Sequence, residues 1–419
     1  MLKLLRQLFP DTGIVRLTYH KMWACMAAIV YLFPARKLKV IAVTGTNGKT
    51  TTVNLLAQTL TGLGKRVGMT STVNFQIGDK VWSNRTKKTT QGRFDLQKLL
   101  RRMVKAGCEY AIIEVSSHAM TQSRMFGVKV DVAVMTNMSD DHIEYHGSFE
   151  KYRAAKGKLF KKFHKYSVLN MDDPGFDYFN SINRGKKVTY GIKKGDFHLL
   201  QVSSGPAGSE FLMHTNEGDV TVSLAIPGFV NIYNALAAFA AISTFGFKYE
   251  DIAKALSNAK GAPGRFERVE IAADFDVVVD YAHDQVSLEK LLTMCRELSE
   301  GRILHVFGAT GGGRDKQKRP KMGTISDKYA DMIFLTNDDP YNEDPHEIIE
   351  MIAEGISRDQ IYKNPDRRVA IHTALSQAQP GDMVVISGKG GEEVIVIGDE
   401  KLPWDDRQIV QEFFKHMNQ

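Results

Sequence analysis

A glycine-rich loop with a lysine followed by two threonines is the first feature of this sequence that could do chemistry. Residues 44–51 read TGTNGKTT and follow the β-branched run LKVIAVT at 38–44, which predicts a buried strand. Apolar residues at helical spacing come next, so the loop should join a strand to a helix. Its glycines would aim backbone N–H groups at a phosphate, with Lys49 on the phosphate oxygens and Thr50 on Mg²⁺.

The match to the general phosphate-loop pattern is partial, because Val43 stands where a strict Walker A sequence has glycine. Taken alone, a GxxGKT string is also compatible with a structural turn. The strand–loop–helix context favours nucleotide binding. The nucleotide-binding residues are then predicted to be Gly45, Thr46, Asn47, Gly48, Lys49, Thr50 and Thr51.

Three further residues could serve a metal or an anion, and each also has an ordinary structural interpretation. Glu114 closes the strand candidate 110–115 (YAIIEV), at the strand end where parallel sheets bind ligands, although polar strand ends are common. His142 follows two aspartates and could equally be a solvated residue or a helix cap. Lys156 lies in a helical pattern with Lys158 and Lys161, and composition alone does not separate the three.

Alternating strands and helices must position these residues. Strand candidates at 130–136 (VDVAVMT) and 167–170, with an amphipathic helix at 95–106, predict a mostly parallel α/β sheet. Segments such as 219–224 (DVTVSL) predict a small antiparallel addition within 195–225. A turn-rich break at 261–264 precedes a second α/β alternation, with strands expected at 275–279, 303–307, 332–335 and 383–386.

We therefore expect three parts: an apolar and basic segment at 1–37, a central P-loop domain at 38–262, and a C-terminal Rossmann-like α/β domain at 263–419. A length of 419 residues fits this division. The composition, 43% apolar and 25% charged, excludes a disordered, collagenous or disulfide-stabilised chain. The three cysteines are far apart in sequence, which favours a reducing, cytoplasmic compartment. The net charge of +7 suits an anionic substrate such as a nucleotide and does not require nucleic acid.

Residues 22–33 (MWACMAAIVYLF) form an unbroken apolar run between basic residues. Twelve residues are too few to span a bilayer, which needs about 20. No small-residue cleavage site follows, which argues against a signal peptide. The run is either a helix packed on the body of the protein or an interfacial helix at the inner membrane face, with Trp23 and Tyr31 as anchors.

The loop TGTNGKTTT resembles the ATP-binding loop of the Mur ligases, the ATP-dependent amide-forming enzymes of bacterial wall precursors. Further motifs similar to the family's follow in its order over about residues 38–400. They are Glu114-Val-Ser-Ser-His118 with Gln122 and Arg124, Thr136-Asn-Met-Ser-Asp-Asp-His142 with Tyr145-His-Gly147, Tyr152-Arg-Ala-Ala-Lys156, Asn231-Ile-Tyr-Asn234, Gly264-Arg265, Asp280-Tyr-Ala-His283, and Gly313-Arg-Asp-Lys316 with Lys318-Arg-Pro320. The chain is most similar to the MurE type, which adds the third residue of the stem peptide.

This resemblance implies a ligase that phosphorylates a carboxylate with ATP and lets an amine attack the acyl phosphate, leaving ADP and phosphate. Both steps concentrate negative charge, so Mg²⁺ and fixed cations should dominate catalysis. The resemblance implies two Mg²⁺ sites, the first on Thr50 and Glu114. The second would be held by His142 and by Lys156 carrying a carbamate derived from CO₂, and carbamate formation requires a neutral lysine amine.

The resemblance also assigns residues around the substrates. Arg265 would reach ATP from the hinge between domains, although a structural salt bridge is the alternative for it. The other nucleotide-side residues would be Asn234, Asp280 and His283. The incoming amino acid would be held by Arg314, Asp338, Asp339, Pro340, Tyr341, Gly388 and Glu392. The muramoyl-peptide acceptor would be held by Thr89, Thr90, Ser116, Gln122 and Arg124.

Two departures from the family pattern bear on the substrates. Mur ligases carry an N-terminal UDP-binding domain of about 100 residues, whereas 37 residues precede the first strand here, so UDP recognition stays open. Ligases that add meso-diaminopimelate have Asp-Asn-Pro-Arg where this chain has Asp338-Asp-Pro-Tyr341. With Glu343 and Asp344 close by, this segment predicts an acidic pocket that prefers a side chain ending in an amine, such as lysine. The alternative is that Tyr341 faces away from the substrate and the family's specificity loop is rebuilt.

We expect a monomeric cytoplasmic ligase that acts on a muramoyl dipeptide, with a C-terminal domain that closes over ATP. Two other functions are compatible with the motifs. One is a related ligase acting on a poly-amino-acid or folate chain. The other is a non-catalytic ATP-binding subunit, which is disfavoured because Glu114, His142 and Lys156 are all present.

Overall fold

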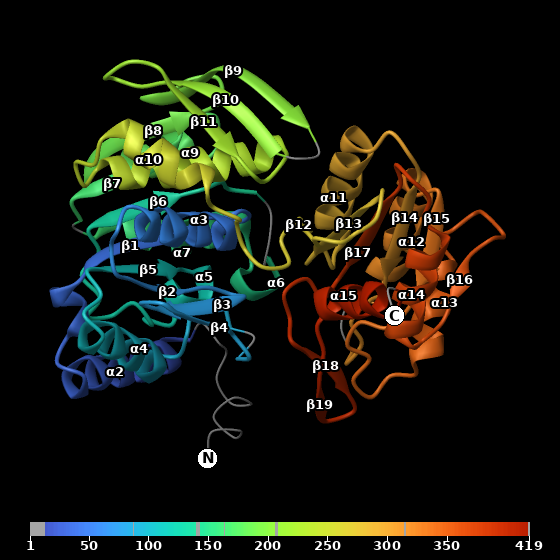
Figure 1. Ribbon diagram of the computed structural model, residues 1–419. Helices are drawn as coiled ribbons and strands as arrows, with labels where there is room; N and C mark the ends of the chain where they lie inside the picture. The colour runs from blue at the N-terminus through green and yellow to red at the C-terminus, as the bar shows by residue number, and fades with distance from the viewer. Residues whose placement is uncertain are drawn as a thin grey trace. The chain divides into compact units, whose positions relative to one another are not determined.

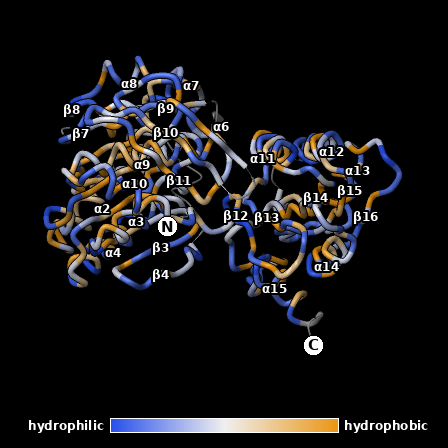
Figure 2. Tube along the Cα trace, turned by 45° about the horizontal axis from the view of Figure 1, so that its top comes forward, coloured by the Kyte–Doolittle hydropathy of each residue, from blue (hydrophilic) through white to orange (hydrophobic). Residues whose placement is uncertain are grey.

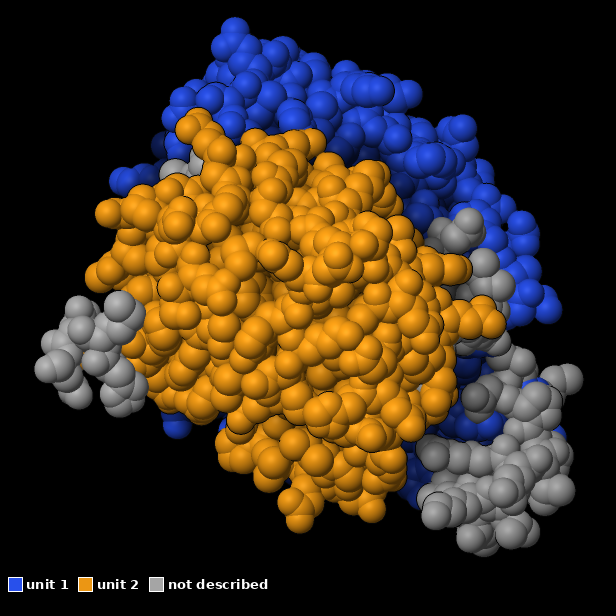
Figure 3. Space-filling model, turned by 90° about the vertical axis from the view of Figure 1, so that its right-hand side faces the viewer, with its two compact units in different colours: residues 1–261 blue, residues 262–419 orange. Residues whose placement is uncertain are grey.

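The computed structural model describes residues 13–86, 88–139, 143–162, 164–205, 208–313 and 316–417 (Figure 1). The chain divides into two compact units, residues 1–261 and 262–419, coloured separately in Figure 3. Each unit is a sheet with helices against it, which confirms the predicted α/β class. Apolar residues run through the interior of both units (Figure 2).

Unit 1 contains a sheet whose described strands number eleven, in the order β11-β10-β9-β8-β7-β6-β1-β5-β2-β3-β4. Its parallel centre consists of β1 (Lys39–Thr44), β2 (Val67–Thr70), β5 (Tyr110–Glu114), β6 (Val132–Met135), β7 (Tyr166–Asn170) and β8 (Lys186–Gly191). At one edge, β3 (Asn74–Ile77) and β4 (Lys80–Ser83) add antiparallel pairs. At the other edge, β9 (Phe197–Gly205) pairs parallel with β8, and β10 (Gly208–His214) and β11 (Val220–Leu224) continue the sheet in antiparallel pairs. The predicted antiparallel addition is confirmed, whereas β3 and β4 were not anticipated.

Strand β1 shows why its sequence is apolar throughout. Val40 and Ala42 face one core and Ile41 and Val43 face the other, and all four are fully buried. A strand covered by helices on both faces loses the alternation of polar and apolar residues that a half-exposed strand keeps. The strand therefore reads as a continuous apolar run that ends at the phosphate loop.

The helices of unit 1 cover both faces of this sheet. One core gathers residues of α3 (Lys49–Gly62), α9 (Phe229–Ser243) and α10 (Tyr249–Ser257), and the other gathers residues of α4 (Arg93–Lys105), α7 (Phe149–Lys161) and α8 (Phe176–Ile182). Short helices α5 (Ser117–Thr121), α6 (Ile143–His146) and η1 (Pro34–Lys37) lie in the connections.

The apolar run predicted as a helix over 22–33 belongs to a longer helix, α2 (Ile14–Val30), which begins earlier and ends sooner than expected. This helix packs against α4, so one of its faces lies on the body of the protein. The 3-10 helix η1 follows directly and leads into β1. Within the described ranges, no helix has the length and apolar character needed to cross a membrane.

Unit 2 has a second sheet, in the order β12-β13-β17-β14-β15-β16. Its parallel strands β13 (Asp276–Asp280), β14 (Ile303–Phe307), β15 (Met332–Leu335) and β17 (Met383–Ser387) match the four predicted ones. The two-residue strands β12 (Glu267–Arg268) and β16 (Tyr362–Lys363), and a hairpin of β18 (Val394–Ile397) and β19 (Glu400–Pro403), were not predicted. The helices are α11 (Gln285–Leu298), α12 (Lys318–Tyr329), α13 (Pro345–Ala353), α14 (Arg367–Gln377) and α15 (Asp406–Met417).

Candidate active site

The glycine loop turns sharply between β1 and α3. Gly45 and Gly48 have positive φ angles of 150° and 78°, which disfavour any residue with a side chain. A Cβ atom at Gly45 would also collide with Thr136, and one at Gly48 would collide with Asn234. Both glycines are therefore fixed by conformation and by space, which a simple surface turn would not require.

Neighbouring residues hold the loop in one shape. The backbone N–H of Asn47 donates to the side-chain oxygen of Asn137 at 2.9 Å, and the Thr136 hydroxyl donates to the Asn47 carbonyl at 2.7 Å. Lys49, the first residue of α3, donates from Nζ to the Thr46 carbonyl at 2.7 Å. The loop is thus preorganised beside a helix N-terminus, where an anion is stabilised.

Glu114 is buried at the end of β5 and reaches the start of α3. Its Oε1 lies 3.0 Å from the Thr50 hydroxyl, which donates to it. Thr72, which sequence analysis did not single out, donates from its backbone N–H to Oε2 at 2.6 Å and from its hydroxyl to Oε1 at 2.9 Å. Thr72 therefore orients the carboxylate, and its position two residues after β2 is the only signal that the sequence offered.

The oxygens of Thr50 and Glu114 suit Mg²⁺, which prefers oxygen ligands and needs one or two carboxylates beside phosphate and water. Within the described ranges, no three His, Cys, Asp or Glu side chains lie close enough together to hold a metal ion by themselves. His142, the predicted ligand of a second Mg²⁺, lies outside the described residues. The geometry thus fits one magnesium site at Thr50 and Glu114 that the nucleotide would complete.

Lys156 differs from its neighbours in α7. It is buried, whereas Lys158 and Lys161 are exposed, so the structure separates three lysines that composition could not. Its Nζ donates to the Gly45 carbonyl of the phosphate loop at 2.6 Å and lies 4.5 Å from the centre of the Tyr152 ring. An ammonium group cannot ligate a metal, so a role as a metal ligand would require the predicted carbamate.

The predicted acceptor residues lie together beside Glu114. The Thr90 hydroxyl donates to the Glu114 carbonyl at 2.8 Å and accepts from the Ser116 N–H at 2.9 Å. Arg124 donates to the Thr90 carbonyl at 2.5 Å and to the Gln122 side chain at 2.7 Å, and burial lowers the pKa of this guanidinium. The hydroxyl of the remaining acceptor residue, Thr89, lies 3.1 Å from the Thr72 hydroxyl and can donate to it.

An aromatic and histidine cluster borders these residues and had been given no role. The ring of His118 lies over that of Tyr145, with centroids 3.9 Å apart. His146 lies 2.9 Å from the Ser117 hydroxyl and 5.4 Å, between ring centroids, from Tyr152. Gln122, a predicted acceptor residue, donates to the Tyr145 hydroxyl at 3.2 Å, so these rings adjoin the predicted acceptor residues. The motifs around Ser117 and Tyr145 were the available signal.

Asn234 borders the phosphate loop from α9. It is buried, accepts from the Thr52 hydroxyl at 3.3 Å and donates to Asn231 at 3.3 Å. Its side chain also occupies the space beside Gly48. This places Asn234 next to the nucleotide loop in unit 1, consistent with its predicted nucleotide-side position.

Arg265, Asp280 and His283 belong to unit 2. The guanidinium of Arg265 lies 4.4 Å from the centre of the Tyr281 ring and interacts electrostatically with Asp280. Asp280 accepts from the N–H groups of Phe266 and Ala282, and burial raises its pKa. His283 lies 2.9 Å from the Tyr281 carbonyl through its Nδ1.

The predicted amino-acid residues gather around a buried lysine that sequence analysis had missed. Lys389 is 0% exposed, and its Nζ lies 2.8 Å from Asp339 Oδ1, 2.8 Å from Glu392 Oε2 and 3.6 Å from Asp338 Oδ1. These carboxylates raise the pKa of Lys389 despite its burial. Gly388, with φ +109°, lies beside Asp338. Arg314 lies outside the described residues.

Tyr341 adopts φ +52°, an uncommon conformation for a tyrosine. Its N–H donates to the Val396 carbonyl at 3.2 Å, its own carbonyl accepts from Gly398 at 2.8 Å, and its ring packs beside Gly312. The hairpin β18–β19 therefore fixes the segment that begins with Asp338, Asp339 and Pro340.

Two of the carboxylates expected to make the pocket around Tyr341 locally acidic have structural partners. Glu343 accepts from the Gly313 N–H at 2.7 Å and from the buried Arg319 at 2.9 Å, and both contacts help to lower its pKa. Asp344 caps the N-terminus of α13. Both carboxylates are thus engaged in structural contacts, which leaves Asp338, Asp339 and Glu392 around Lys389 as the acidic groups.

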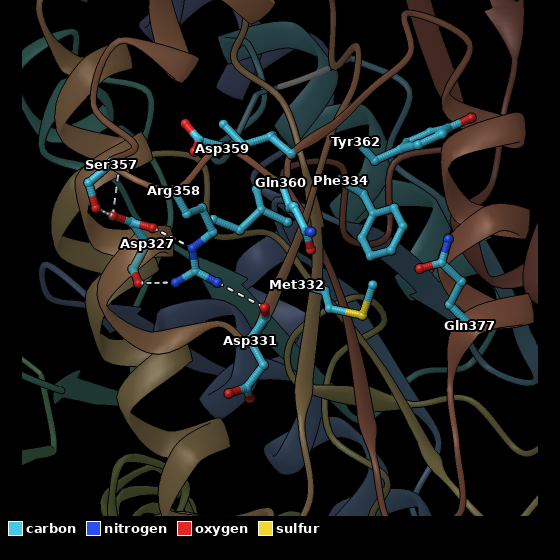
Figure 4. Close-up of a pocket in the computed structure, with 12 residues that line it drawn as sticks. Asp327, Asp331, Met332, Phe334, Ser357, Arg358, Asp359, Gln360, Tyr362 and Gln377 are labelled. Atoms are coloured by element: carbon cyan, nitrogen blue, oxygen red, sulfur yellow. Dashed lines mark hydrogen bonds and ion pairs between the residues drawn. The ribbon is translucent and has the colours of Figure 1, made fainter.

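A groove of about 880 Å³ lies elsewhere on unit 2, along β15 and β16 (Figure 4). Arg358 crosses it and donates to Asp327 at 2.6 Å and to the Asp331 carbonyl at 2.8 Å. No predicted site residue lines this groove, and these charged groups are already paired. It therefore contributes nothing to the candidate active site.

The fold and the site define a P-loop α/β enzyme with a second, Rossmann-like unit. Residues 43–242 match the Mur ligase middle domain, and residues 264–390 match the Mur ligase glutamate ligase domain. The chain belongs to the Mur ligase family.

Named relatives and solved structures agree. The UDP-N-acetylmuramoyl-L-alanyl-D-glutamate–2,6-diaminopimelate ligase of Geobacillus thermodenitrificans is 41% identical over 94% of this chain and 82% of its own length. The ligase of the same name from Caldanaerobacter subterraneus is 40% identical over 97% and 85%. A solved structure of a ligase with this name has a TM-score of 0.68 and 33% identity, covering 91% of this chain and 79% of that one. Mycobacterium tuberculosis folylpolyglutamate synthase shares the fold, with a TM-score of 0.71 at 16% identity over 87% and 91% of the two chains.

Proposed function

We propose that this protein is an ATP-dependent ligase that adds an amino acid to a muramoyl dipeptide in peptidoglycan biosynthesis. The observation that carries the proposal is the adjacency, within unit 1, of the phosphate loop, the buried Glu114 and the acceptor residues Thr90 and Arg124. This arrangement would bring the γ-phosphate of ATP to the acceptor carboxylate. The named activity of the relatives supports the same reaction.

In the proposed reaction, Lys49 stabilises the charge that develops on the transferred phosphate, while Thr50 and Glu114 hold Mg²⁺ against it. Arg124 would bind a carboxylate of the acceptor. We further propose a carbamate on Lys156, supported by its burial and by its contact with the phosphate loop. A carbamate there would replace an ammonium group by an anion able to help His142 hold a second Mg²⁺.

For the incoming amino acid, we propose a substrate with a second ammonium group, a feature common to lysine and diaminopimelate. Three carboxylates surround the single ammonium of Lys389 in unit 2, so this group of residues retains an excess of negative charge. Such an excess favours a cationic side chain. The names of the relatives favour diaminopimelate, and Tyr341 in place of arginine favours lysine.

An ADP-release assay tests the proposal. The purified chain should release ADP from ATP only when both UDP-N-acetylmuramoyl-L-alanyl-D-glutamate and an amino acid are present. Lys49→Ala should abolish this release, while the matched variant Lys80→Ala, at an exposed lysine of β4, should leave it unchanged. Turnover with a folate or poly-amino-acid acceptor instead would favour the related ligases, and ATP binding without turnover on any acceptor would favour a non-catalytic subunit.

For its state in the cell, we propose a monomer that works on the cytoplasmic side and makes peripheral contact with the inner membrane face through residues 22–33. The apolar residues exposed on α2 support that contact. Light scattering from the purified protein would test the monomer.

A further inference from the structure

Helix α2 packs on unit 1 through its small side chains and exposes its large apolar ones. Its small residues Ala24, Ala27 and Ala28 are buried, with Ala28 close to Gly127. Its large apolar residues point outward, at 65% exposure for Met22, 42% for Met26, 56% for Ile29 and 58% for Val30. A helix that serves only to cover a core buries its large apolar side chains and exposes its polar ones. Here the spacing of 22, 26, 29 and 30 makes one outward stripe.

The end of α2 extends this stripe. Leu32 and Phe33 both adopt positive φ angles, of 58° and 49°, which are costly for residues other than glycine. The turn leaves Leu32 at 70% exposure. Strained backbone that displays an apolar side chain to water indicates a surface built for contact.

Cations border the stripe. Residues 13–37 contain Arg16, Lys21, Arg36 and Lys37 and no acidic residue. The neighbouring α4, which lies beside α2 in Figures 1 and 2, adds five basic residues and one acidic one: Arg93, Lys98, Arg101, Arg102 and Lys105 against Asp95. The Trp23 ring bridges the two helices by packing edge-on against Phe94 at 5.8 Å. Together α2, η1 and α4 thus combine an apolar ridge with nine basic residues and one acidic one. Arg93 among them is half-buried and donates to the Gln122 carbonyl, which leaves eight basic residues for the face.

We propose that α2 and α4 together form a face that docks on an anionic lipid bilayer. The outward residues of α2 insert among the acyl chains, and the cations of both helices contact the headgroups. This inference extends the membrane contact proposed above to α4 and to a class of lipid, and it does not depend on the ligase reaction. It also revises the expected anchors, because Trp23 packs on Phe94 and Tyr31 is partly buried, so the stripe of Met22, Met26, Ile29 and Val30 is the inserted surface.

A second copy of the chain fits this face less well. A two-fold interface brings the same patch of both subunits together, which would set the basic residues of one copy against those of the other. A negatively charged bilayer complements both the apolar and the basic parts of the face.

Co-sedimentation of the full chain with vesicles tests the proposal. Binding should be strong to vesicles of phosphatidylcholine with about one third phosphatidylglycerol, at least tenfold weaker to phosphatidylcholine alone, and weakened by 0.5 M salt because the headgroup contacts are screened. Met26→Glu/Ile29→Glu should reduce binding at least tenfold. Lys98→Glu/Lys105→Glu should also reduce it and should remove most of its salt dependence.

The matched control is Leu200→Glu/Val202→Glu, which makes the same change at two exposed apolar positions of β9. It should bind vesicles like the unmodified protein. All variants should have the same thermal unfolding and the same ADP release with a soluble acceptor. The ADP-release assay thus tests the ligase proposal separately from the docking face. Equal sedimentation of the Met26→Glu/Ile29→Glu variant and the unmodified chain would refute the docking face. The docking face would also be refuted if the unmodified protein bound no vesicles and formed a dimer that the Met26→Glu/Ile29→Glu variant dissociates.

Discussion

Lys389 offers a sharp test of the proposed amino-acid site in unit 2. It is fully buried, and its ammonium group lies between the carboxylates of Asp339 and Glu392. Asp339 also accepts from the Val396 N–H at 2.8 Å, which ties the lysine to the hairpin β18–β19. Replacing Lys389 by methionine keeps the length of the side chain and removes the charge. The carboxylates would then repel one another in a buried position.

The expected cost follows from this burial. Removing one partner of a buried ion pair destabilises a protein by about 3–5 kcal/mol, because the remaining charge is left uncompensated. Natural domains are stable by about 5–15 kcal/mol, so unit 2 of Lys389→Met should be greatly weakened. The same variant should bind its amino acid at least about 30-fold more weakly. Misplacing Asp339 and Glu392 should cost about 2 kcal/mol of binding free energy, which corresponds to that factor.

Urea unfolding and steady-state kinetics would measure the two effects. KM for the amino acid should rise while KM for ATP stays within about threefold, and Lys389→Arg should recover part of the loss because it keeps the charge. Lys401→Met, at an exposed lysine of the same hairpin, is the matched control and should behave like the unmodified protein. Unfolding within about 1 kcal/mol of the unmodified chain, with an unchanged KM for the amino acid, would refute this account of Lys389.

Three further predictions concern catalysis, specificity and acid stability. Lys49→Ala and Lys156→Ala should each lower turnover at least about 100-fold, and a short carboxylic acid should partly rescue only Lys156→Ala; near-normal turnover of Lys156→Ala would contradict the carbamate. Tyr341→Arg should raise kcat/KM for meso-diaminopimelate relative to lysine by about tenfold or more, through a bidentate contact with the distal carboxylate; an unchanged ratio would show that position 341 does not contact the substrate. Burial lowers the pKa of His305 to about 3, below the usual value of about 6.5 in an unfolded chain. The unfolded state therefore binds the proton first, and stability should fall by about 2 kcal/mol between pH 7.5 and pH 5, a slope that His305→Gln should flatten.

Much of the central fold could be predicted from the sequence because its signals are local. Strands β1, β5 and β6 are short apolar runs bounded by polar or glycine-rich residues, and the two glycines of the phosphate loop follow β1 at once. The two-residue strands β12 and β16 carry no such signal, because two residues have no periodicity. They exist only through pairing with longer neighbours.

Thr72 shows why part of the site escaped prediction. Its contact with Glu114 depends on the register between β2 and β5, in which Thr70 lies opposite Ile113. That register brings residues about 40 positions apart to the same sheet edge. A single sequence states neither the order of the strands nor their register, so a threonine in a loop looks like any other polar residue.

Charge is the property for which sequence and structure differ most. Glu343 and Asp344 counted toward an acidic pocket in the sequence, yet one pairs with Arg319, 24 positions away, and the other caps a helix. Lys389 had no assigned role, although it compensates carboxylates 50 and 3 positions away in the chain. Counting charged residues along a segment ignores their partners elsewhere in the chain. A bound substrate interacts with the net charge that remains after those ion pairs have formed. We therefore expect the choice of amino acid to depend on the charge balance around Lys389 as much as on Tyr341.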